Sequence, residues 1–165
     1  MNHFFRSLGL SAALSLAIAA GTLPSTAHAY DTASTAAINV AEDAVILHGH
    51  DAVAYFTSGK PVQGDAKFSA KHAGATYRFA SEANLKAFQA NPTAYAPQYG
   101  GFCAMGAALG KKLDVDPTQF KVVDGKLYLN VNADVFKKWS ENVPGNIATA
   151  DTNWPAIKDQ APSAL

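Results

Sequence analysis

The chain has 165 residues, and its 13 lysines and arginines equal its 13 aspartates and glutamates, so the formal net charge is zero with neutral histidines. A protein that binds nucleic acid through its phosphates needs a clustered excess of basic residues. The lysine doublets Lys111-Lys112 and Lys137-Lys138 are isolated, and we expect both on the solvated surface. The composition therefore argues against a nucleic-acid partner.

Residues 1–29 have the pattern of a secretory signal peptide. Arg6 precedes an apolar run over residues 8–20, and the small residues Ala27 and Ala29 flank one larger residue just ahead of Tyr30. A transmembrane anchor needs about 20 continuous apolar residues, and this run is shorter. We expect cleavage before Tyr30, a periplasmic or secreted location, and no stable membrane anchor afterwards.

The remaining chain is long enough for one compact core and too short for two ordinary domains. We divide it into a flexible lead-in at residues 30–44, a packed domain at 45–157 and a C-terminal tail at 158–165. The lead-in is mostly Ala, Thr, Ser and Asp, with little to bury. Residues 45–47 (VIL) are typical of a short strand, and Asp51 is placed to cap a short helix after it.

A first hairpin is predicted in the middle of the chain. Residues 68–72 and 76–79 flank the sequence Ala73-Gly74-Ala75, which is typical of a tight turn. Ser81 then begins a helix, because its hydroxyl can accept hydrogen bonds from free backbone amides. Asn91-Pro92 ends this helix.

A second hairpin has the clearest local signal, since Asp124-Gly125 lies between strands at residues 120–123 and 126–129. Asn132 caps the next helix, and Pro144-Gly145 is expected to end it.

Short helices complete the expected domain. Small and apolar residues over 103–109 predict a buried helix that begins just after Gly100-Gly101. Residues 146–154 are expected to be helical, with Trp154 anchoring them to the core. We find no internal repeat in the sequence. The predicted fold class is α+β, a small single domain of antiparallel hairpins packed with short helices.

Four motifs in order resemble the exported bacterial YHS domain-containing proteins. They are residues 49–56 (GHDAVAYF), 74–81 (GATYRFAS), 99–104 (YGGFCA) and 124–130 (DGKLYLN). The resemblance covers most of the chain after residue 29 and implies a small α+β domain with a role in binding transition metals such as copper. In one respect the chain departs from the metal-binding members of that family. Ala80 stands after Phe79, where those domains typically have a cysteine.

Cys103 is the only cysteine, so an exported chain of this sequence cannot form an internal disulfide. Its thiol can be a small buried apolar group, a bridge to another chain, or a ligand for a soft metal. In the first turn of a helix, free amides and the helix dipole would favour the thiolate.

Soft metals such as copper(I) or zinc prefer sulfur and imidazole ligands, and few of these are available. We take Cys103, His50, His48 and Met105 as the candidate metal ligands. His48 and His50 are two positions apart, and in an extended strand this spacing would place both imidazoles on one face. The alternative is that Cys103 is buried, Met105 fills a gap in the core, and the histidines lie on the surface.

The sequence leads to one main functional hypothesis and two alternatives. The main one is an exported, non-enzymatic YHS domain protein that binds copper or zinc through Cys103 with help from His50, His48 or Met105. The first alternative is a metal-free ligand- or protein-interaction module with a structural cysteine. The second is a thiol-dependent redox protein. Enzyme activity is not expected, because neither paired carboxylates nor a cysteine-hydrolase signature is found. The protein partner stays unknown.

Overall fold

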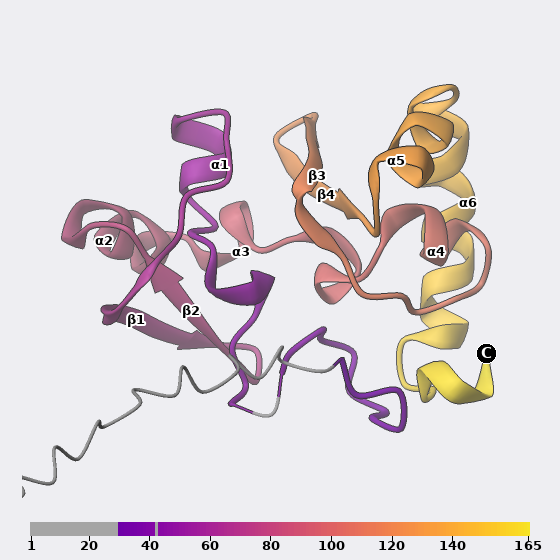
Figure 1. The fold of residues 1–165 in the computed structure, drawn as a ribbon, viewed down its shortest axis with the longest axis horizontal. Helices are drawn as coiled ribbons and strands as arrows, with labels where there is room; N and C mark the ends of the chain where they lie inside the picture. The colour runs from indigo at the N-terminus through magenta and orange to yellow at the C-terminus, as the bar shows by residue number, and fades with distance from the viewer. Residues whose placement is uncertain (1–29, 42) are drawn as a thin grey trace, which may run out of the picture.

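The computed structural model describes residues 30–41 and 43–165 (Figure 1). The predicted signal peptide lies outside the described residues. Within them, none of the helices combines the length and the apolar character needed to span a bilayer.

The described residues form two antiparallel two-stranded sheets and a set of mostly short helices. The strands are β1 (Asp65–His72), β2 (Ala75–Phe79), β3 (Asp116–Val123) and β4 (Lys126–Asn130). The α-helices are α1 (Ala54–Thr57), α2 (Glu82–Ala90), α3 (Pro92–Tyr95), α4 (Ala104–Ala108), α5 (Ala133–Ser140) and α6 (Val143–Ile157). Three 3-10 turns are η1 (Leu47–Gly49), η2 (Gln98–Gly101) and η3 (Pro162–Ala164). The predicted small α+β domain of hairpins and short helices is confirmed.

The first hairpin and its helix form as the sequence predicts. β1 pairs with β2 through the Ala73-Gly74 turn, where both residues have positive φ, 49° and 85°. Along β2 the side chains of Ala75, Tyr77 and Phe79 are buried while the alternate ones are not, which is the period-two pattern of a sheet with one face in the core. Ser81 caps α2, because its Oγ accepts the amide of Asn84 at 3.1 Å.

The second hairpin is also confirmed. β3 and β4 join through Asp124 and Gly125, which have φ of 50° and 71°, the left-handed geometry that an Asp-Gly turn favours. The Oδ1 of Asn132 accepts the amide of Val135 at 2.9 Å and caps α5. One boundary is wrong: Pro144 lies in the first turn of α6, where its missing N–H costs no hydrogen bond, and so begins a helix where we expected one to end.

Each half of the chain repeats one arrangement, although the sequence shows no repeat. In both hairpins an eight-residue strand pairs with a five-residue strand, and a capped helix follows. The register shifts at the same place, after the pair Asp65–Phe79 in one hairpin and Asp116–Asn130 in the other. The two hairpins lie in separate halves of the molecule (Figure 1).

Of two hydrophobic clusters, the larger one holds the halves together. The larger one contains Phe79 and Phe88 of the first half together with Leu127 and Leu129 of the second. The smaller one lies among α4, α5 and α6 and contains the fully buried Trp139. As expected, Trp154 anchors α6, since its ring centroid lies 5.7 Å from that of Tyr99 and 6.0 Å from that of Phe102.

We call residues 30–41 the N-terminal strap. The sequence led us to expect a flexible lead-in here, but the strap lies against the second half of the chain. The backbone amide of Asn39 donates to the carbonyl of Gly100 at 2.9 Å, and the hydroxyl of Tyr30 donates to the carbonyl of Lys112. Specific hydrogen bonds to the domain therefore begin ahead of Val45.

We expected Lys112 on the solvated surface, but this prediction is wrong, because the residue is only 1% exposed. Its ammonium group donates to the carbonyls of Ala36 at 2.7 Å, Lys158 at 3.0 Å and Gln160 at 2.7 Å. It also lies 4.8 Å from the ring centroid of Phe102. Three acceptors and an aromatic face make this burial tolerable for a cation.

Candidate functional site

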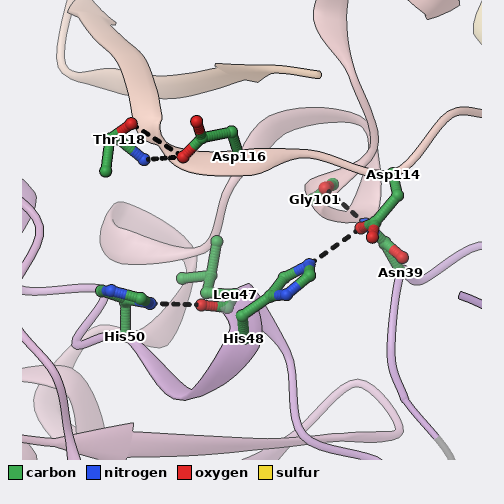
Figure 2. A network of polar contacts seen from close by, with 8 residues as sticks. All are labelled: Asn39, Leu47, His48, His50, Gly101, Asp114, Asp116 and Thr118. Carbon is green, nitrogen blue, oxygen red and sulfur yellow. Dashed lines mark hydrogen bonds and ion pairs between the residues drawn. The ribbon is translucent and has the colours of Figure 1, made fainter. Parts of the chain in front are cut away.

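His48 lies within η1 and His50 directly follows it, and this segment is a tight turn and not the extended strand that we expected. Leu47, His48 and Gly49 all have positive φ, of 57°, 51° and 79°. The chain therefore reverses its direction between the two imidazoles, and each ring has its own partner (Figure 2). The expectation that both rings share one strand face was wrong.

His48 forms part of a polar network that joins four segments of the chain. Its Nε2 lies 2.9 Å from Oδ1 of Asp114, and the same oxygen accepts Nδ2 of Asn39 at 2.8 Å. Asn39 Nδ2 also donates to the carbonyl of Gly101 at 3.2 Å. The network therefore connects η1, η2, the loop before β3 and the N-terminal strap (Figure 2).

The network shifts the pKa values of both ionisable partners. The hydrogen bond to Asp114 raises the pKa of His48 and outweighs the opposing effect of burial. For Asp114, burial alone would raise the pKa, but the hydrogen bonds from His48 and Asn39 outweigh it and lower the pKa overall. Both shifts favour the charged pair.

This pair predicts a pH-dependent contribution to stability. Because the pKa of His48 is raised, its contribution is full below its ordinary value of 6.5 and is lost as the pH rises through the raised value. Because the pKa of Asp114 is lowered, its contribution is present above its ordinary value of 3.8 and is lost as the pH falls. We expect the free energy of unfolding of the wild type to exceed that of His48→Gln by the largest amount between pH 3.8 and pH 6.5. The effect is at most about 1 kcal/mol for so exposed a pair.

Urea unfolding of both proteins at intervals from pH 4 to pH 9 measures this difference. The backbone strain at position 48 is common to all pH values, so only the pH-dependent part of the difference reports the ion pair. A difference that stays constant over the whole range contradicts the pairing.

His50 is oriented by a different partner. Its Nδ1 lies 3.0 Å from the carbonyl oxygen of Leu47. Since a carbonyl can only accept, Nδ1 carries the proton and the lone pair of the neutral ring is on Nε2. A backbone carbonyl that fixes the tautomer in this way is also found behind metal-binding imidazoles.

Cys103 lies elsewhere, at the N-cap of α4, and is completely buried. Its Sγ accepts the amide of Gly106 at 3.3 Å, and its thiol donates to Oδ1 of Asn130 at 3.6 Å. Burial raises the pKa of the thiol despite the opposing effect of nearby amides, so the expected stabilisation of a thiolate is outweighed. Met105 is partly buried and packs against both hydrophobic clusters.

The structure does not gather the four candidate ligands into one site. Neither imidazole and no methionine sulfur is among the hydrogen-bond partners of Cys103. In the part of the chain that the structure describes, no group of three or more His, Cys, Asp or Glu side chains is arranged to hold a metal ion.

Asp51 has a larger role than the capping that the sequence predicts. It is completely buried, and its Oδ1 accepts the amides of Val53 at 2.8 Å and Ala54 at 3.2 Å. Its Oδ2 accepts the amide of Ala80 at 2.8 Å and Nδ2 of Asn84 at 2.7 Å. One carboxylate thus joins the start of α1 to the junction of β2 and α2. No local pattern reveals the second pair of bonds, because they come from residues about 30 positions away.

Comparison with known proteins identifies one family within the chain. A family model described as YHS domain matches residues 53–99, which run from the start of α1 to η2. No curated protein and no solved structure matches the chain. The matched segment ends before Cys103, so the cysteine lies outside it. A YHS domain is therefore found at residues 53–99, a segment that ends within η2.

Proposed function

We propose that the protein is an exported, non-enzymatic YHS domain protein that acts as a ligand- or protein-interaction module, with Cys103 serving the fold. The observation that carries this proposal is the complete burial of a thiol whose polar neighbours are backbone amides and the side chain of Asn130. The raised pKa of Cys103 also argues against a redox role, since the thiolate is the reactive form.

A resident soft metal at Cys103 fits this geometry poorly. The sulfur would have to lose its proton in an apolar environment and recruit ligands from residues that are held by other partners. His48 is paired with Asp114, and Met105 packs in the core. The residues present therefore do not fit a cysteine-centred site.

A second candidate function is binding of copper or zinc at the imidazoles of η1, and one observation favours it. In His48 and in His50 one ring nitrogen is held by an oxygen acceptor, which leaves the other nitrogen of the neutral ring with a lone pair. Oxygen partners of this kind orient imidazole ligands in many metal sites. The YHS domain that follows η1 in the chain is consistent with such a role.

Copper(I) titration of the protein from Tyr30 to Leu165, against a competing chelator, tests both candidates. We expect Cys103→Ser to bind copper(I) with the same affinity and stoichiometry as the wild type. Loss of a bound equivalent in that variant would contradict a structural role for the cysteine.

The variant His48→Ala/His50→Ala separates the two candidates. Weaker binding in this variant, with no change in His72→Ala, would favour the second one. His72 is a suitable control because its ring packs against Phe88, with 5.9 Å between the ring centroids, and lies on β1. Binding that is equally weak in all variants would favour the metal-free module.

Export is part of the proposal and is supported by the sequence pattern of residues 1–29. The mass of the protein recovered from the periplasm or the medium of an expressing bacterium tests it. We expect a chain that begins at Tyr30, and recovery of the uncleaved chain from the cytoplasm would contradict export.

A further inference from the structure

We infer that the chain consists of two copies of one structural unit, residues 45–90 and 97–140, and that Cys103 occupies in the second copy the position of Asp51 in the first. Cys103 is then a positioning residue whose sulfur must accept hydrogen bonds, and not a filler of apolar space.

The hairpins and their helices correspond residue by residue. Asp65 and Asp116, which begin the first strand of each hairpin, lie 51 positions apart, and the same spacing relates every other pair in the two registers. It also relates the helix caps Ser81 and Asn132, each of which accepts the amide three residues on. A register shift at the same point of both hairpins is unlikely to arise from pairing rules alone, because a bulge is specific to its position.

The turns that precede the hairpins correspond as well, with a spacing of 52. Tyr99, Gly100 and Gly101 have φ of 52°, 61° and 83°, and so repeat the three successive positive values of η1. Each turn is preceded by one parallel bridge to the second strand of its hairpin. These bridges are Val45 to Thr76 and Pro97 to Leu127.

The positions of Asp51 and Cys103 have the same backbone partners. The amide of Asp51 donates to the carbonyl of Val62 at 2.8 Å, and that of Cys103 donates to the carbonyl of Leu113 at 3.0 Å. The two carbonyls are 51 positions apart, so the connecting loop in the second copy is one residue shorter than in the first.

The side chains at the two positions also receive equivalent donors. Asp51 accepts the amides of the residues two and three positions later, and that of Ala80 at the strand–helix junction. The Cys103 sulfur accepts the amide of Gly106 at 3.3 Å, and the amides of Met105 and Val131 are near enough to lower its pKa, although that of Met105 donates to Oδ1 of Asn130 at 3.2 Å. These three amides are the counterparts of those around Asp51. Both side chains therefore connect a helix start to a strand–helix junction.

The copies differ in their turns and in one neighbour. Gly100 and Phe102 stand where η1 has His48 and His50, so the imidazole pair belongs to the first copy alone. Asn130, next to the thiol, has a buried Nδ2 without a hydrogen-bond partner among the described residues. The atom of Asn130 that faces position 103 is Oδ1, which accepts the thiol at 3.6 Å and the amide of Met105 at 3.2 Å.

Two neutral substitutions separate an acceptor role from space filling. Asparagine at position 103 supplies an oxygen for the amide of Gly106 and an NH2 group for Oδ1 of Asn130, while valine is apolar and about one methyl group larger than cysteine. We expect the urea midpoint of Cys103→Asn to exceed that of Cys103→Val, and the valine variant to lose amide-exchange protection at Gly106 and Val131.

A valine midpoint equal to or above that of asparagine would overturn the inference, because a filler of apolar space prefers valine. Failure of the asparagine variant to fold, with a folded valine variant, would overturn it equally. The result depends on neither metal binding nor export, so the inference shares with the proposed function only the structural role of Cys103.

Discussion

Replacing Gly100 by alanine is expected to lower the stability severely. Among the described glycines with positive φ, we expect the largest loss at this one. A Cβ at this position would overlap the carbonyl oxygen of Ala37 and lie 2.9 Å from its carbonyl carbon. Gly100 also has a φ of 61°, which alanine adopts only with strain. Because the obstacle is backbone, the N-terminal strap would have to leave its place. We expect a loss of at least about 3 kcal/mol, at the upper end of single-substitution effects.

Gly110→Ala is the matched control for this substitution. Gly110 has a similar φ of 71°, but nothing lies within 4 Å of a Cβ built there. The control should therefore lose only the stability that backbone strain costs, about 1–2 kcal/mol. Urea unfolding of both variants measures the difference, and equal losses would mean that the strap contributes nothing to the stability of the domain.

Asp51→Asn is expected to be the second severe change. The substitution keeps the size of the side chain but replaces one acceptor oxygen by an NH2 group. That group would face donors, either the amides of Val53 and Ala54 or the donors from Ala80 and Asn84. Breaking a fully buried set of charge-assisted hydrogen bonds costs about 3–5 kcal/mol. Chemical denaturation, followed by tryptophan fluorescence, measures the loss.

Asp65→Asn is the control for the aspartate substitution. Asp65 also accepts a backbone amide two residues on, that of Lys67 at 2.9 Å, but its carboxylate is half exposed to water. Its replacement should leave the unfolding midpoint where it is. If Asp51→Asn behaves in the same way, the carboxylate at position 51 does not organise the first half of the chain.

The parts of the fold that the sequence predicts correctly are those that depend on neighbouring residues. Asp124-Gly125 determines its hairpin because both positions need positive φ, and Ser81 and Asn132 cap helices because the amides that they bind are three residues away. Such signals are complete within a few residues, so one sequence is enough to recognise them.

The parts that the sequence misses depend on distant partners. No residue near Lys112 in the sequence indicates that the carbonyls of three distant residues make its burial possible. These residues are Ala36, Lys158 and Gln160. The duplication is hidden for a related reason. A turn with three positive φ values is formed by Leu47, His48 and Gly49 in one copy and by Tyr99, Gly100 and Gly101 in the other, so the backbone repeats while only the last residue type is shared.

The candidate site shows the same limit. The sequence identifies the right residue types for soft-metal binding, but grouping Cys103 with His48 and His50 required that two turns approach each other. The two turns do approach each other, because the network of His48 reaches the carbonyl of Gly101, but the thiol of Cys103 is buried against Gly106 and Asn130.

The ammonium group of Lys112 makes the two ends of the described chain depend on each other. It binds a carbonyl of the N-terminal strap and two carbonyls just beyond α6. Trimming either end would leave the same buried cation with fewer oxygen neighbours and would thereby weaken the hold on the other end. The extremities of this protein should consequently loosen together, as one cooperative step, and not fray independently.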